Sequence, residues 1–106
     1  MTDAFIPDPD IRDEREARRY ALDVEGQTVV VLYNEAAGGL LITETLTPPS
    51  LEGRGLASRM ARHVLGDIRS RGLVVLPTCP FFAHYLGKHR EWSDIVHPAY
   101  RAALGL

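Results

Sequence analysis

The first half of the chain alternates apolar and polar positions with a period of two, which is typical of half-buried β-strands. Three stretches carry this pattern, namely residues 19–25, 28–34 and 40–47. In the first of them, Tyr20, Leu22 and Val24 fall on one face. Pro48 and Pro49 follow the last stretch, and proline cannot donate a hydrogen bond to a strand ladder. We therefore predict an antiparallel meander of three strands that ends at the two prolines.

The second half changes to a period close to four residues, which indicates an amphipathic helix over residues 56–71. The apolar positions that share one face of this helix are Leu56, Met60, Val64 and Ile68. Gly72 suits a C-terminal cap, and the wholly apolar residues 73–77 suit a strand that is buried on both faces. Residues 80–92 predict a short helix with Pro80 in its first turn, weakened toward its end by a glycine.

This order of elements predicts an α/β (α+β) fold with a mixed sheet. An antiparallel three-stranded meander is followed by a βαβ unit, whose strands are normally parallel, and by a C-terminal helix. Residues 1–11 are rich in aspartate and proline, so we expect a flexible N-terminal segment there. Residues 12–106 then form a single domain, because a chain of 106 residues leaves no room for a second one.

Composition narrows the possible partners and compartment. The formal net charge of −2 argues against a general nucleic-acid binder, which would normally be basic. The N-terminus begins with acidic residues and lacks the apolar core of a signal peptide, and no apolar run is long enough to span a membrane. Cys79 is the only cysteine, which excludes an intramolecular disulfide and fits a reducing cytoplasm. We expect a cytoplasmic protein with no nucleic-acid or membrane partner.

Two glycines, Gly53 and Gly55, stand one residue apart at the start of the predicted long helix. A helix N-terminus presents unpaired amides and the positive end of the helix dipole, and both suit an anion such as phosphate. The small Ala57 keeps the approach open, while Arg54 and Arg59 can add positive charge. The alternative is that the glycines only make a tight strand-to-helix connection. The spacing alone does not decide between the two.

Three further patterns occur in order along the chain. The helix start has the form x-G-[RQK]-G-[IVL]-[GA], the next strand ends in P-x-C-P, and the following helix contains Y-[IL]-x-x-H. The stretch from Leu51 to Val96 thereby resembles the core of the GNAT superfamily of acetyl-CoA-dependent N-acetyltransferases. More narrowly, it is similar to the very short single-domain GNAT-like proteins. The resemblance extends weakly back to about residue 12, and it implies a minimal GNAT fold.

The resemblance also implies a cofactor, acetyl-CoA, and residues that bind it. In the superfamily the coenzyme pyrophosphate binds the amides of the glycine-rich turn, which correspond to Gly53, Arg54, Gly55, Leu56, Ala57 and Ser58. The pantetheine arm would lie beside Leu46 and Thr47, in the splay between that strand and residues 73–77. Pro48 or a β-bulge would keep these strands from pairing throughout. Glu52 departs from the glutamine or arginine that most members have at this place.

Acetyl transfer to an amine needs a base for the amine and an acid for the departing thiolate. Glu44 falls on the same alternating face as Leu40 and Ile42, so we expect a partly desolvated carboxylate with a raised pKa, suited to act as the base. Short members of the family often have histidine there, and the alternative is a solvated face. By resemblance, Tyr85 lies near the cofactor sulfur and is the expected acid. A merely packed tyrosine ring is equally compatible.

Cys79 ends the last predicted strand and directly precedes a helix N-terminus, a position that can lower a thiol pKa. A covalent acetyl-cysteine step and a structural buried cysteine both stay open. Cys79 also forms a C-x4-H-x4-H pattern with His84 and His89. Because side chains five residues apart on a helix diverge by about 140°, these groups do not converge as metal ligands do. We expect no metal site.

The leading hypothesis is an acyltransferase that moves an acetyl group from acetyl-CoA to an amine acceptor of unknown identity. The alternative is a non-catalytic module that binds coenzyme A or acyl-CoA. The chain lacks the extra N-terminal helices and last strands that shape the acceptor site in full-length superfamily members. The acceptor side is therefore open in a monomer or completed by a second subunit in a homodimer.

Overall fold

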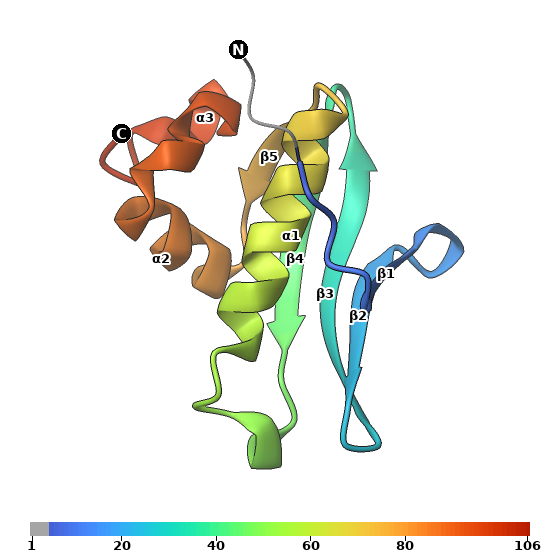
Figure 1. Cartoon of the computed structure of the whole chain (residues 1–106). Helices are drawn as coiled ribbons and strands as arrows, with labels where there is room; N and C mark the ends of the chain where they lie inside the picture. Colours follow the sequence, from blue (N-terminus) through green and yellow to red (C-terminus); the bar gives the residue numbers. More distant parts are fainter. Residues whose placement is uncertain (1–4) are drawn as a thin grey trace.

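A computed structural model describes residues 5–106. A five-stranded mixed sheet forms its centre, and the strand order follows the chain (Figure 1). The strands are β1 (Ile11–Glu14), β2 (Arg19–Val24), β3 (Gln27–Ala36), β4 (Gly39–Leu46) and β5 (Val74–Pro77). All neighbouring pairs are antiparallel except β4 and β5, which are parallel. The predicted mixed α/β fold class is confirmed.

The helices lie on one face of the sheet (Figure 1). The α-helices are α1 (Leu56–Ser70), α2 (Pro80–Lys88) and α3 (Pro98–Arg101), and short 3-10 turns are η1 (Arg15–Ala17), η2 (Pro49–Leu51) and η3 (Arg90–Ile95). The long α1 follows β4, while α2 and α3 stand toward β5. The helix predicted over residues 80–92 is shorter than expected. It ends one residue after Gly87, a residue that weakens helices, and the chain continues as η3.

The first strand, β1, was not predicted, so the antiparallel part has four strands instead of three. Ile11 of β1 pairs with Leu22 and is buried, but the other three residues of the strand are charged. A four-residue strand with one apolar side chain shows no alternation. It is held by its pairing with the longer β2, by the burial of Ile11 and by ion pairs of its charged side chains.

A single hydrophobic core fills the space between the helices and the covered face of the sheet. The predicted apolar face of α1 is confirmed, since Met60, Val64 and Ile68 are fully buried. Alternate residues of the strands complete the core, namely Tyr20, Leu22, Val29, Val31, Tyr33, Leu40, Ile42 and Val75. Burial of the apolar surface at these sites supplies the main driving force for the fold.

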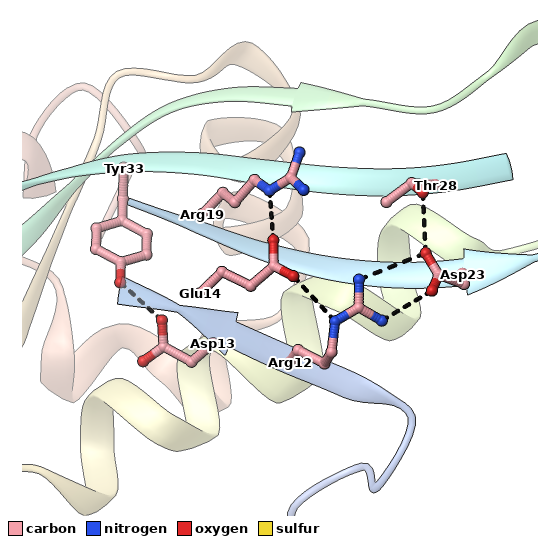
Figure 2. A network of polar contacts seen from close by, with 7 residues as sticks. All are labelled: Arg12, Asp13, Glu14, Arg19, Asp23, Thr28 and Tyr33. Carbon is pink, nitrogen blue, oxygen red and sulfur yellow. Dashed lines mark hydrogen bonds and ion pairs between the residues drawn. The ribbon is translucent and has the colours of Figure 1, made fainter. Parts of the chain in front are cut away.

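The opposite face of the sheet carries a network of charged side chains from β1 and β2, which Thr28 of β3 joins (Figure 2). Arg12 contacts Glu14 at 3.0 Å and Asp23 at 2.9 Å, and Glu14 also accepts from Arg19 at 2.6 Å. Each of these arginines is therefore balanced by a carboxylate. The arginine-rich N-terminal region is a mixed-charge exposed surface, as its sequence indicates.

A β-bulge interrupts β4 at Thr43. On β3, Leu32 and Tyr33 are adjacent, but their partners on β4 are Glu44 and Ile42, so Thr43 is one extra residue. A bulge shifts the alternation of side chains by one position. Beyond Thr43, the even-numbered residues of β4 consequently leave the core face and the odd-numbered residues enter it.

The ladder between β4 and β5 ends next to this bulge, at the pair Ile42–Pro77. The amides of Thr78 and Cys79 both donate to the Ile42 carbonyl, at 3.1 and 2.9 Å, before the chain turns away into α2. Because β4 continues to Leu46, its last four residues have no partner strand on the β5 side within residues 5–106. The splay expected between these strands is present, and it coincides with the bulge.

The predicted flexible segment of residues 1–11 falls partly outside the described residues, which begin at Phe5. From there to residue 10 the chain runs along α1 toward β1 (Figure 1). The Asp8 amide donates to Nδ1 of His63 at 3.0 Å, and the Phe5 ring packs edge-on against His63 at 5.3 Å. The flexibility of the segment stays a prediction, but its described part contacts the folded body.

These contacts generate a pH-dependence prediction. Burial lowers the pKa of His63 below 6.5, although the carboxylates of Asp67, Asp8 and Asp13 act in the opposite direction. A folded pKa below the unfolded one means that His63 contributes stability above about pH 6.5, and this contribution is lost as pH falls through the folded pKa. We expect wild type to lose more stability than His63→Gln between about pH 7.5 and about pH 5.5, measured by urea unfolding. Equal losses in the two proteins would contradict the prediction.

Candidate functional site

A pocket of about 320 Å³ opens between the N-terminus of α1, the end of β4 and the start of α2. This volume is in the range of small-molecule sites. Its lining residues are Thr45, Thr47, Leu51, Glu52, Gly53, Gly55, Leu56, Ala57, Ser58 and Phe81. The glycine-rich turn and the end of β4, which are separate in the sequence, thus meet at one cavity.

The N-terminus of α1 offers free hydrogen-bond donors to this pocket. Gly55 is the N-cap residue, and no side chain caps the helix. The first amide of the region with a backbone partner is that of Arg59, which donates to the Gly55 carbonyl at 3.0 Å. Among the described residues, none accepts a hydrogen bond from the amides of residues 53–58. Together with the helix dipole, these donors suit an anion.

The two glycines are required by backbone conformation. Gly53 and Gly55 have φ angles of +79° and +76°, which side-chain-bearing residues rarely adopt. A Cβ atom at either position would meet open space. The tight connection and the exposed amides are therefore two consequences of one turn, and the two sequence interpretations do not exclude each other.

The arginines that were expected to add charge to the turn have other partners. Arg54 pairs with Glu25 at 2.8 Å and does not line the pocket. Arg59 pairs with Asp8 and Asp10, at 2.5 and 3.0 Å, on the side of α1 that faces the N-terminal segment. As the side chains are placed, neither guanidinium faces the pocket.

The bulge determines which residues of β4 face the pocket. Thr47 lines it, as expected, but Leu46 does not and is 47% exposed. Thr45 lines the pocket, although no feature of the sequence selects it. The alternation of β4 would have placed Thr45 on the far face, and nothing in the sequence marks the extra residue at Thr43.

The expectation for Glu44 is wrong in one respect. Its carboxylate does not share a face with Leu40 and Ile42, because the bulge turns it to the face of the sheet that the helices leave open. Glu44 is exposed, so the predicted partial desolvation is absent. It lies in the unpaired part of β4, beside the splay. The catalytic role of Glu44 stays a prediction, now with the carboxylate on the open face.

Cys79 lies behind the pocket and not in its wall. It is 2% exposed, and its Sγ lies 3.3 Å from Oγ1 of Thr45, which does line the pocket. The thiol is therefore screened from the cavity by Thr45 and belongs to the hydrophobic core. This burial favours the structural alternative over a covalent acetyl-cysteine step.

Tyr85 is buried in α2, stacks on His89 at 4.0 Å and does not line the pocket. Burial raises the pKa of its hydroxyl, an effect that the nearby Arg62 partly offsets. The Tyr85 hydroxyl thus lies toward α1 and η3. Phe81, one turn earlier in α2, does contact the pocket. A role for Tyr85 as the acid stays a prediction.

Among residues 5–106, no three histidine, cysteine, aspartate or glutamate side chains converge as the ligands of a metal ion would. In the same residues, no helix is both long and apolar enough to cross a membrane.

The mixed sheet, the splayed strand pair and the uncapped helix N-terminus define a class of proteins in which free amides at the start of a helix lie next to a splayed pair of strands. Comparison with known families identifies it. A family described as GCN5-related N-acetyl-transferase matches residues 19–95, from the start of β2 to the end of η3. The chain therefore belongs to the GCN5-related N-acetyltransferase family. No curated protein matches the chain.

The position of Cys79 predicts its reactivity. Because the thiol is buried behind Thr45, we expect it to react with a thiol reagent such as dithionitrobenzoate at least about tenfold more slowly in the native protein than in denaturant. Absorbance of the released thiolate measures the rate. Thr45→Ala, which removes the screening side chain, should accelerate the native reaction. Rapid labelling of the folded wild type would show that the thiol is accessible.

Proposed function

We propose that the protein is an N-acetyltransferase that uses acetyl-CoA as acetyl donor and an amine as acceptor. The observation that carries this proposal is the single pocket that joins the free amides of residues 53–58 to the unpaired end of β4. Membership in the GCN5-related N-acetyltransferase family supports the reaction class. We place the reaction in the cytoplasm, because a lone free cysteine fits a reducing compartment.

The residues present fit the two ends of such a donor. The amides of Gly53 to Ser58 suit a pyrophosphate, because they are unpaired donors at the positive end of α1. The edge of β4 from Thr43 to Leu46 suits an extended amide-containing arm, because it lacks a partner strand within the described chain. Leu46 contributes through its backbone, since its side chain points to the other face.

The chemistry requires an activated acetyl group, a neutral amine and a proton for the departing sulfur. When bound, acetyl-CoA supplies the acetyl group as a thioester. The Glu44 carboxylate, on the open face beside the splay, accepts a proton from the acceptor ammonium. Tyr85 is the proposed proton donor to the sulfur. Because Tyr85 is buried, this role requires α2 to expose the hydroxyl to the sulfur when the donor is bound.

The alternative function, a non-catalytic coenzyme A-binding module, has one observation in its favour. Among the residues that line the pocket, Glu52 is the only acid, base or nucleophile of the kinds usual in acyl transfer, apart from hydroxyl groups. Cys79 and Tyr85 lie outside the wall. A module that only binds would need the amides and the strand edge and nothing more.

A pair of opposite charge changes at the pocket tests where the anionic donor binds. Ala57→Glu adds a carboxylate beside the amides and should weaken binding of acetyl-CoA about tenfold or more, although a glutamate in the first turn suits the helix. Glu52→Gln removes a carboxylate from the lining and should strengthen binding about two- to fivefold. Isothermal titration calorimetry at low salt measures both. Ala57→Ser is the matched control and should bind as wild type does.

No binding by wild type would sink the proposed function. If neither charge change altered the affinity for acetyl-CoA, the donor would bind elsewhere on the molecule.

A turnover measurement separates the transferase from the binding module. Glu44→Gln should lower kcat for a primary-amine acceptor about 100-fold, in the range that general base catalysis contributes, while acetyl-CoA still binds. Release of free coenzyme A thiol follows the reaction, and Glu35→Gln, also exposed on the sheet, is the matched control. Turnover that Glu44→Gln leaves unchanged would remove Glu44 from the mechanism. A wild type that binds acetyl-CoA but never turns over would favour the module.

A further inference from the structure

The N-terminal residues 5–10, here called the strap, lie antiparallel to α1 on its solvent-facing side. Three contacts define this path. Phe5 packs over Gly66 and His63, the Asp8 amide donates to His63, and Asp10 reaches Arg59, nearer the start of the helix. The strap therefore passes along α1 toward its N-terminus, where the pocket described above opens.

Gly66 allows the strap to pack closely against α1. A glycine in a helix interior is destabilising relative to alanine, so Gly66 calls for a local explanation. Gly66 has no positive φ that would require glycine. A Cβ atom at this position would instead collide with the Phe5 ring. The absence of a side chain at Gly66 thus leaves the space that the Phe5 ring occupies.

The strongest polar contact of the strap is with Arg59. Its guanidinium donates to both carboxylate oxygens of Asp8, at 2.5 and 2.9 Å, and to Asp10 at 3.0 Å. Bidentate pairs of this kind fix geometry as well as charge. The Arg59 guanidinium lowers the pKa of the Asp8 carboxyl, and Asp8 raises that of Arg59. The strap holds this cation in a defined place.

Arg59 stands close enough to the pocket for its side chain to reach it. It directly follows Ser58, which lines the pocket, and it lies one turn from the helix start. Side chains on a helix lean toward the N-terminus, and one turn spans about 5.4 Å, within reach of an arginine. No acidic residue stands in the first turn of α1. Asp8, Asp10 and a bound phosphate are therefore alternative partners for the same guanidinium.

We propose that the strap is autoinhibitory: Asp8 and Asp10 occupy the Arg59 guanidinium that a phosphate bound at the N-terminus of α1 would otherwise recruit. This inference rests on the proposed function, since it regulates the same anion site. Binding of a phosphate-bearing ligand and docking of the strap oppose each other, and by linkage each weakens the other by the same factor.

The test is a double-mutant cycle on coenzyme A affinity, measured by calorimetry at low ionic strength. Asp8→Asn with Asp10→Asn removes the strap charges while keeping the side-chain shapes and the Asp8 amide. This variant should bind coenzyme A about 3- to 10-fold more tightly than wild type. In an Arg59→Gln background, the same two changes should give no gain. Glu16→Gln with Glu35→Gln removes two exposed carboxylates elsewhere and controls for net charge.

A second readout follows the strap itself. In wild type, saturating coenzyme A should speed hydrogen exchange at the Asp8 amide, because the strap loses Arg59. The inference is overturned if the Asp8→Asn, Asp10→Asn variant binds no more tightly than wild type, or if its gain persists without Arg59 or appears equally in the control. Those outcomes leave the proposed function standing as long as wild type binds. If no variant binds coenzyme A, the proposed function and the strap inference both fall.

Discussion

One extra residue, Thr43, sets the geometry on which the rest of the site depends. Up to Ile42, β4 is an interior strand with neighbours on both sides. Beyond the bulge it keeps only β3, and its side chains exchange faces. A continuous β4 would have placed the Glu44 carboxylate in the core and turned Thr45 away from the cavity. The bulge therefore avoids a buried charge and opens the splay in the same step.

The arginines described above, near the pocket and on the open face of the sheet, are paired with carboxylates. Arg54 is bound by Glu25, Arg59 by the strap, and the arginines of the open face by Glu14 and Asp23. The anion-binding capacity that remains exposed is the backbone of the turn, which carries only partial charge. A site of this kind recognises the geometry of a phosphate more than its total charge.

The sequence predicted the elements whose periodicity is strong. The helix expected over residues 56–71 is observed as α1 (Leu56–Ser70), because its apolar face is repeated over four turns. The glycine-rich turn was predicted because backbone positions with positive φ angles favour glycine, and glycines are apparent in the sequence. β1 could not be found, since its charged residues show no alternation and are held by contacts with residues distant in the sequence. The bulge was equally hidden, because threonine is as good a strand former at an extra position as at a regular one.

That hidden bulge explains why the candidate site was predicted only in part. The residues of the turn, Arg54 excepted, line one cavity, and their role in binding a cofactor stays a prediction. Glu44, which was placed by counting along β4 past Thr43, lies on the opposite face from the one expected, and Leu46 does not line the cavity. Phe81 was missed because its contact with the cavity depends on how α2 packs, which the local pattern does not encode.

The C-terminal segment has a consequence for what the sheet can bind. Val96 forms a parallel bridge with Val75, and the His97 amide donates to the Val75 carbonyl at 3.0 Å, which covers the outer edge of β5. The opposite edge, β1, is short and charged, as edges that resist association with other strands often are. Inside the described sheet, the gap between β4 and β5 therefore offers a stretch of unpaired strand backbone next to the pocket. A thin extended molecule can enter that gap, whereas a strand of another protein, with neighbours of its own, cannot.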